Sequence, residues 1–276
     1  MISQAGQTRR VGAVSFLNTL PLIDGLQRTE NVELLLDVPS KLSARLVAGE
    51  TDVSLCSVID QQTSDCELEL VPVGLIGCDG PTDTVRLFSK VPFNGLSRIA
   101  CDMHSHTSVI LLQVILAQVH EIEPELYAFD ALGSQEQPEA MLLIGDKVVL
   151  NEPSVDDYPH QLDLGEAWKA LTNLPFVFGA WFQRADTDQA QSEVARQLAI
   201  ILDHRRRHNL GRIESIIATE APARGWDVSR ARTYLRHRLR FKPTAERIEA
   251  IREFHRRAGD VGAITDPRPL RVAEFV

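Results

Sequence analysis

The chain has 276 residues, of which 44% are hydrophobic and 24% charged, and this composition is typical of a water-soluble folded protein. Its formal net charge of -9 and its pI near 5.4 argue against a nucleic-acid-binding surface. The basic run at residues 204–208 is interpreted as the solvated end of a helix. We therefore expect no nucleic-acid partner, and a length that suits one large domain or two lobes.

No apolar run approaches the ~20 residues of a membrane span, and the first residues lack a signal-peptide pattern. The four cysteines form no CxxC pair and have no metal-type spacing with histidine. We therefore expect a cytoplasmic protein with reduced thiols, without a membrane partner. The sequence does not predict the oligomeric state.

The first element is a short apolar run at residues 11–14, which suits a buried strand of a parallel sheet. Ser15, Asn18 and Thr19 follow at its carboxyl end, where open α/β folds place their ligands. Pro21 then marks the turn into a helix, whose free N–H groups can meet an anionic ligand. The alternative is an ordinary strand-to-helix turn with Asn18 as a cap.

The next elements continue a strand-helix-strand rhythm. Residues 32–38 and 52–58 are predicted strands, and a helix is predicted between them at residues 41–48. Ser40 is the expected cap of this helix, and Gly49 its end. Segments of this length predict parallel strands joined by right-handed crossovers.

Two further strands, at residues 68–76 and 85–89, flank a loop at residues 77–84 that is rich in Gly, Pro, Asp and Thr. Such a loop turns sharply and can present hydroxyl and backbone N–H groups to a ligand. A plain hairpin connection is the alternative interpretation.

The opening pattern then recurs. A strand at residues 98–101 leads through a polar turn at residues 102–108 into an apolar helix at residues 109–119. Two anion-friendly helix starts, one in each half, favour a ligand held between two lobes. His104 and His106 bracket Ser105 in this turn, but without a third spaced partner they are weak candidates for metal ligands.

The second half contains strands and then helices. Strands are predicted at residues 126–129 and 141–144, and the second ends beside Asp146, which is either a functional acid or a turn former. A helix starts near residue 163, and an aromatic-rich strand follows at residues 175–182. We expect its aromatic side chains to belong mainly to the core, and secondarily to the wall of a ligand site. Four amphipathic helices close the chain, at residues 189–207, 212–221, 228–239 and 245–258.

Without a long linker, the two lobes must be joined through strands, and we expect the crossings near residues 89–92 and 178–181. The predicted lobe I comprises residues 1–90 and 180–276, and lobe II residues 91–179. No P-loop, GxGxxG, GxSxG, HExxH or zinc-ligand pattern is present. The local patterns thus predict an α/β protein with a polar interlobe cleft for a small acidic ligand, and leave open whether it is a binder or an enzyme.

Six blocks in order carry a more specific signal: VSFLNTLPLIDGL, PSKLSARLVAGETDVSLCSV, CDGPTDTVRLFSK, SHTSVILLQVIL, LLIGDKVVL and DLGEAWKALTNLPFVFGAWFQR. Together they resemble the MqnA-type chorismate dehydratases of the futalosine route to menaquinone. The resemblance covers residues 10–184 and implies a periplasmic-binding-protein type II fold that has become a cytosolic enzyme without a metal or organic cofactor. The family's reaction converts chorismate to 3-[(1-carboxyvinyl)oxy]benzoate and water.

Two alternatives remain at this stage. A non-enzymatic small-anion binding protein would have the same fold and the same helix-start sites. The related 1,4-dihydroxy-6-naphthoate synthase also shares the fold, but its opening motif typically differs from SFLNTLP.

The resemblance also implies roles for individual residues. Asn18 matches the motif asparagine, placed to hydrogen-bond the leaving hydroxyl or to orient the ring. Thr84 stands where many relatives have Ser; it keeps the hydroxyl, while its methyl group stiffens the rotamer and narrows the pocket. These two residues are the predicted catalytic pair. No protein carboxylate is expected to take the C3 proton, because it would be repelled by a dianionic substrate, so the substrate's enolpyruvyl carboxylate is the predicted base.

The predicted substrate-binding residues surround this pair, and they are Ser15, Thr19, Ser57, Ser105, Thr107, Ser108 and Asp146. The hydroxyls at residues 105–108 match the Ser/Thr cluster that the resemblance assigns to carboxylate binding at the second helix start. Asp146 matches the family's IGD block, as a functional carboxylate or, preferably, as structural support. Asn173, where relatives often have Gly, is expected in the left-handed region.

Overall fold

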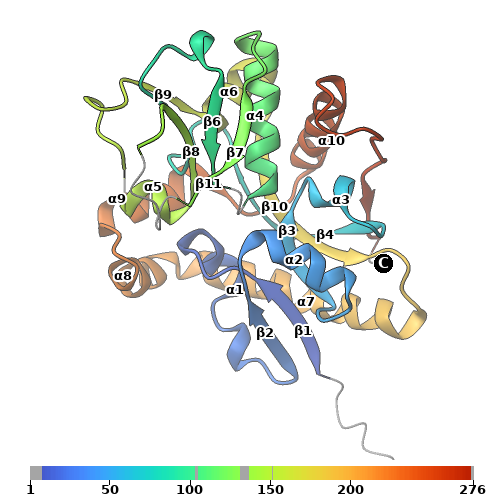
Figure 1. Ribbon diagram of the computed structural model, residues 1–276. Coiled ribbons are helices and arrows are strands. Elements are labelled where there is room, and N and C mark those ends of the chain that lie inside the picture. Colours follow the sequence, from blue (N-terminus) through green and yellow to red (C-terminus); the bar gives the residue numbers. More distant parts are fainter. Residues whose placement is uncertain (1–7, 103–104, 131–136, 151, 275–276) are drawn as a thin grey trace, which may run out of the picture.

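The computed structural model describes residues 8–102, 105–130, 137–150 and 152–274. Within these ranges the strands form a seven-stranded sheet and a five-stranded sheet. Figure 1 shows the two sheets with helices packed around each. The predicted two-lobed α/β architecture is confirmed.

The first sheet has the strand order β11-β4-β10-β3-β1-β2, and β12 pairs with β4. Its strands are β1 (Arg9–Ala13), β2 (Val32–Leu36), β3 (Val53–Ser57), β4 (Leu68–Cys78), β10 (Phe176–Arg184), β11 (Leu239–Arg240) and β12 (Arg271–Val272). Strand β1 lies parallel to both β2 and β3, as the strand-helix-strand rhythm predicts. The carboxyl ends of β1 and β3 therefore point to the same edge of the sheet.

The second sheet has the order β7-β6-β8-β5-β9. Its strands are β5 (Val85–Ser89), β6 (Arg98–Cys101), β7 (Glu125–Ala128), β8 (Ala140–Ile144) and β9 (His160–Asp163). Strand β6 is parallel to β7 and β8, whereas β5 runs antiparallel to β8 and β9. The sequence patterns missed β9, because it has four half-buried residues without clear alternation.

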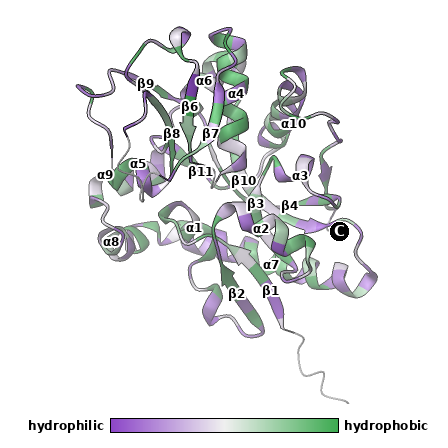
Figure 2. Cartoon of the chain, in the orientation of Figure 1, coloured by the Kyte–Doolittle hydropathy of each residue, from purple (hydrophilic) through white to green (hydrophobic). Residues whose placement is uncertain are grey.

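Helices cover both sheets (Figure 1). They are α1 (Leu20–Ile23), α2 (Pro39–Val47), α3 (Asp60–Thr63), α4 (His106–Val119), α5 (Asp146–Leu150), α6 (Leu164–Thr172), α7 (Gln189–Gly211), α8 (Ile213–Ala223), α9 (Val228–Thr233) and α10 (Ala245–Asp260). Short 3-10 turns lie at Leu17–Thr19, Leu26–Arg28 and Phe93–Gly95, and a π-helix at Tyr234–Arg238. Helix α4 is apolar on most sides in Figure 2, since it is packed against both α6 and α10.

The chain passes between the sheets earlier than the sequence patterns predict. Strand β5 belongs to the second sheet, so the loop at residues 79–84 joins the two sheets and is not a hairpin connection. The return runs through α6, because all of β10 pairs within the first sheet. The lobe limits stay a prediction, and we propose to move them to residues 79–84 and 164–175.

A cluster of aromatic side chains lies in the core where the chain passes from α6 to β10. The rings of Trp168 and Phe176 contact one another at 5.2 Å, and Phe254 lies 5.0 Å from Phe176. All three are almost completely buried, and they tie α6, β10 and α10 together. The same strand presents Phe178 to the pocket, so its predicted place in the core is confirmed, while its role as a ligand wall stays a prediction.

Several helix ends follow local chemistry. Helix α2 begins at Pro39, and Ser40 lies within it rather than capping it, because proline favours the first helical position. Gly49, at φ 71°, follows its end as predicted. Asn173 adopts the predicted left-handed conformation, at φ 58°, and ends α6. The expected helix at residues 228–239 is instead α9 followed by the π-helix.

Candidate active site

A pocket lies between the two sheets, where the carboxyl ends of β1, β3 and β8 meet the start of α4. It encloses about 640 Å³ of atom-free space, part of it open to solvent, which is within the size range of small-ligand sites. Its described lining contains no Asp, Glu, Lys, Arg or His. Burial raises the pKa of the lining Tyr234 phenol and Cys56 thiol, so these groups stay neutral at pH 7.

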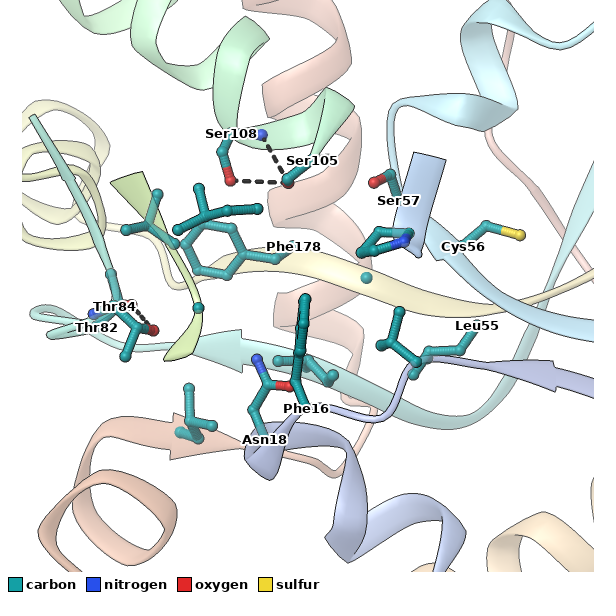
Figure 3. A pocket seen from close by; sticks show the side chains of 18 of the residues that line it. Phe16, Asn18, Leu55, Cys56, Ser57, Thr82, Thr84, Ser105, Ser108 and Phe178 are labelled. Atoms are coloured by element: carbon teal, nitrogen blue, oxygen red, sulfur yellow. Dashed lines mark hydrogen bonds between the residues drawn. The ribbon is translucent and has the colours of Figure 1, made fainter. Parts of the chain in front are cut away.

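One end of the pocket is the start of α4. Ser105 caps this 14-residue helix, and its Oγ accepts a hydrogen bond from the Ser108 backbone N–H at 3.3 Å. The two hydroxyls also bond one another at 2.9 Å, which uses one O–H and leaves the other able to donate. Figure 3 shows both side chains at the pocket wall. Hydroxyls and free N–H groups at a helix N-terminus form a site suited to a carboxylate.

The opposite end carries Asn18, which lies across the pocket from Ser105 and Ser108 in Figure 3. The Thr19 hydroxyl donates to Asn18 Oδ1 at 3.1 Å. The amide nitrogen carries two N–H groups, so it can donate to a ligand as well as to the neighbouring Tyr234 hydroxyl.

Thr84 forms the side wall next to this end and is 2% exposed. Its Oγ1 lies 2.8 Å from the Tyr234 hydroxyl and 3.3 Å from Thr82 Oγ1. A hydrogen bond from Asn18 also lowers the pKa of the Tyr234 phenol, against the larger effect of burial. Asn18, Tyr234 and Thr84 therefore form one connected polar network at the pocket wall.

The loop that carries Thr84 is fixed by Asp163, the N-cap of α6. The Asp163 carboxylate accepts from the backbone N–H groups of Thr82 (3.0 Å) and Asp83 (2.7 Å), as well as from two N–H groups of its own helix. A Cβ on Gly165 would lie 2.6 Å from the Gly80 carbonyl, so glycine permits this close approach. Helix α6 therefore holds the loop and the hydroxyl of Thr84 in place.

Tyr234 is held from its other side. The indole ring of Trp226 stacks on it at 5.0 Å with a 17° interplanar angle. Trp226 Nε1 donates to Asp146 Oδ1 at 3.1 Å, and a hydrogen bond from the Leu17 backbone lowers the pKa of Asp146. Burial has the larger effect and raises that pKa. Asp146 thus connects the end of β8 with the opening turn and with the support of Tyr234, which favours the structural interpretation of this residue.

The structure places the predicted site residues in two groups. Five of them line the pocket, namely Asn18, Ser57, Thr84, Ser105 and Ser108. Four others lie outside its lining, and one of these is Asp146, which bonds Trp226 as described above. Ser15 is exposed, Thr19 is buried behind Asn18, and Thr107 is buried with its hydroxyl accepting from the Ile59 N–H at 3.4 Å. Thr19 and Thr107 lie in helical turns, where successive side chains point about 100° apart, so each faces away from the pocket that its neighbour Asn18 or Ser108 lines.

The structure describes only one of the two histidines in the turn before α4. His104 lies outside the described residues. His106 Nδ1 contacts Asp60 Oδ1 at 2.6 Å, and this hydrogen bond raises the pKa of His106. Within the described ranges no group of three or more His, Cys, Asp or Glu side chains is placed to hold a metal. Nor does any described helix have the length and hydropathy needed to cross a membrane.

Sequence reasoning missed part of the pocket. Tyr234, Thr82 and Phe16 line it, although none was singled out as a candidate. Tyr234 begins a π-helix, an element that is often found at functional sites. A π-helix has no local sequence pattern, so this indication appears only in the structure. Thr82 lay within the polar loop that the sequence did indicate.

The two sheets with a pocket between them define a periplasmic-binding-protein-like fold. A solved protein of Archaeoglobus fulgidus superposes with a TM-score of 0.69 and 18% identity, over 92% of this chain and 98% of that one. The aliphatic sulphonate binding protein SsuA of Escherichia coli gives a TM-score of 0.64 with 14% identity, over 95% of each chain.

The family follows from the sequence comparison. Residues 9–260 match the family model described as menaquinone biosynthesis, so the chain belongs to this family. It is also 29% identical to the chorismate dehydratase of Thermus thermophilus over 228 residues, which are 76% of this chain and 81% of that protein.

Proposed function

We propose that this protein is a chorismate dehydratase that forms 3-[(1-carboxyvinyl)oxy]benzoate and water in the futalosine route to menaquinone. The family match and the similarity to the Thermus dehydratase support the assignment. The observation that carries it is the uncharged pocket, with a capped helix start at one end and the Asn18, Thr84 and Tyr234 network at the other. We place the reaction in the cytoplasm, where the resembling enzymes act.

Binding uses the helix start. Ser105, Ser108 and the first N–H groups of α4 receive one substrate carboxylate, while Ser57 lines the wall nearby. Neutral hydrogen-bond donors can hold the substrate carboxylates without pairing them with a cation. A cation would lower the basicity of the carboxylate that takes the C3 proton. Helix α4 belongs to lobe II and Asn18 to lobe I, so closure of the lobes brings both ends onto the substrate and excludes water.

The reaction breaks the C3–H and C4–O bonds of the ring, and the C–H electron pair becomes the new C3–C4 double bond. The enolpyruvyl carboxylate of the substrate takes the C3 proton. The Asn18 amide and the Thr84 hydroxyl donate to the oxygen that leaves C4. The removed proton and the departing hydroxide together make the water, so the protein returns unchanged without an organic cofactor or a metal. Aromatisation supplies the driving force.

The role of Asp146 separates this mechanism from one with a protein base. In Asp146→Asn, the amide oxygen can still accept from Trp226, so we expect kcat to fall no more than about threefold. Steady-state kinetics with a thermal melt checks this. Loss of turnover in a folded variant that still binds substrate would contradict the substrate-assisted step.

The rival is a binding protein, because the fold is shared with SsuA, an aliphatic sulphonate binding protein. The decisive experiment incubates the purified protein with chorismate and follows the products by chromatography with mass detection. A product lighter than chorismate by one water supports the dehydratase. Chorismate recovered intact from folded protein would contradict it, and cyclic dehypoxanthinyl futalosine would then test the related naphthoate synthase activity.

A further inference from the structure

A second hollow lies behind the segment that carries Tyr234, outside the pocket described above. It is formed by the end of α7, the start of α8, the π-helix, β11 and the start of α10, and it measures about 850 Å³ with a wide opening to solvent. Leu210, Ile213, Leu235 and Phe241 give it an apolar floor. We call it the basic groove, since its remaining lining carries the cations described next.

The sequence around the basic groove is unusual for this chain. Residues 228–243 contain six Arg or Lys and no Asp or Glu, although the whole protein has a net charge of -9. Four of these arginines pair with carboxylates: Arg230 with Glu152, Arg232 and Arg236 with Glu214, and Arg238 with Asp83. Two cations of the stretch, Arg240 and Lys242, form no ion pair with any described residue, and neither does Arg247 of α10 beside them.

The two unpaired arginines are held in place by backbone carbonyls. Arg240 Nη1 donates to the carbonyls of His237 (2.8 Å) and Leu239 (2.9 Å), and Arg247 Nη1 donates to that of Lys242 (2.9 Å). Their side chains are therefore ordered without a counter-ion, which is an arrangement that a bound anion can complete.

Arg247 carries the strongest indication of a missing partner. Its Nε is buried and has no hydrogen-bond acceptor among the described residues. Burial and the nearby charge of Arg240 lower its pKa, while the carboxylates of Asp79 and Glu246 act in the opposite direction. Asp79 is paired with Lys169 at 2.8 Å, so it does not neutralise the two guanidinium groups directly. A buried donor without a partner costs free energy, which a turn of the Arg247 side chain toward an anion in the groove would recover.

We propose that the basic groove binds a small organic anion, whose carboxylate or phosphate meets Arg240 and Arg247 and whose apolar body covers the few exposed atoms of the apolar floor. The inference goes beyond the proposed function and does not depend on it. Leu239 lines both this groove and the first pocket, and Tyr234 begins the π-helix between them. The groove and the first pocket therefore share the segment that carries Tyr234.

The test uses one probe, 6-bromo-2-naphthoate, titrated into the full chain by calorimetry. Arg247→Gln and Arg240→Gln should each weaken binding about tenfold or more, since each removes a charge-assisted hydrogen bond. Arg247→Lys should weaken it less, because the charge remains. The control is Arg252→Gln on the same helix, where Arg252 pairs with Glu249 away from the groove, and its affinity should equal that of the wild type. Melting curves confirm that each variant is folded.

The anomalous signal of bromine in a crystal soaked with the probe gives its location. Density between Arg247 and Phe241 supports the proposal. Bromine in the pocket of Asn18 alone, equal affinities for Arg247→Gln and wild type, or no binding at millimolar probe would each overturn it.

Discussion

The two helix starts that face the pocket come from the same sequence pattern and have different structures. After β1, a Ser/Thr-bearing turn leads into a 3-10 turn and the four-residue helix α1, neither of which has a side-chain cap. After β6, a similar turn leads into the 14-residue helix α4, which Ser105 caps. The two ends of the pocket thus differ in the length of the helix behind them.

This difference separates two chemical tasks. A long helix concentrates partial positive charge and free N–H groups at its start, whereas a four-residue helix has little dipole to offer. The non-helical backbone of Asp24 and the left-handed Gly25 end α1 after one turn, so this end of the pocket relies on the side chain of Asn18 in the preceding 3-10 turn. We infer that the α4 end binds the substrate carboxylate and that the α1 end assists the leaving group.

The largest predicted effect comes from the α1 end. Asn18→Ala removes the donor to the leaving oxygen, so we expect kcat to fall about 10²–10³-fold, with a smaller change in KM. Ser15→Ala is the matched control, because Ser15 is exposed in the same turn and should leave both constants unchanged. A large rise in KM at constant kcat would instead place Asn18 in binding.

The α4 end should behave in the opposite way. Ser105→Ala removes both the cap of α4 and a hydroxyl that meets the carboxylate, and we expect KM to rise about 10–100-fold, with less change in kcat. Loss of the cap should also cost about 1 kcal/mol of stability. Ser97→Ala, at an exposed position before β6, serves as the control. An unchanged KM would show that the substrate carboxylate does not bind at the start of α4.

Tyr234→Phe tests the support of the α1 end. The phenol bonds Thr84 at 2.8 Å while its ring stacks on Trp226, and phenylalanine keeps the stacking but not the bond. We expect kcat to fall about 3–10-fold and Tm to fall by about 2–6 °C, because the buried Thr84 hydroxyl loses a partner. Kinetics identical to the wild type would show that Thr84 holds its position without the phenol.

The smallest effect concerns the ion pair that anchors the α4 end to the other lobe. The hydrogen bond that the His106 ring donates to the Asp60 carboxylate raises the pKa of His106 above its unfolded value. This contribution to stability is therefore complete below pH 6.5 and is lost as the pH rises through the folded pKa. Because the His106 side chain is 37% exposed, we expect a loss of less than about 1 kcal/mol, or about 1–3 °C in Tm.

Melting curves between pH 6 and 9 measure this dependence. His106→Gln should lose the alkaline decrease, whereas His204→Gln, at an exposed position of α7, should keep it. An unchanged slope in His106→Gln would assign the decrease to other groups.

The sequence patterns predicted most of the fold where the signal is local. Strands β1, β3 and β6 are short apolar runs that end in polar turns, and the structure confirms them. The left-handed Asn173 and the helix end at Gly49 followed in the same way from residue chemistry. Family resemblance, rather than any pattern, singled out Thr84, which the structure places in the wall of the pocket.

Features that depend on distant residues were not predictable. Strands β4 and β5 flank a loop of the kind found in hairpins, and only pairing with β8 and β9 places β5 in the second sheet. Asp163 was expected only near the start of a helix, but it also holds the Thr84 loop from 80 residues away. Thr19 and Thr107 have the right chemistry in the right turns, yet each faces away from the pocket and bonds a neighbour.

The measurement that tests the central claim most directly is a crystal structure of this protein with 3-[(1-carboxyvinyl)oxy]benzoate bound. Our account predicts a carboxylate of the product on Ser105, Ser108 and the first N–H groups of α4, with the ring within hydrogen-bond reach of Asn18 and Thr84. A product whose carboxylates both lie at the Asn18 end, or one bound outside the pocket between the two sheets, would contradict it.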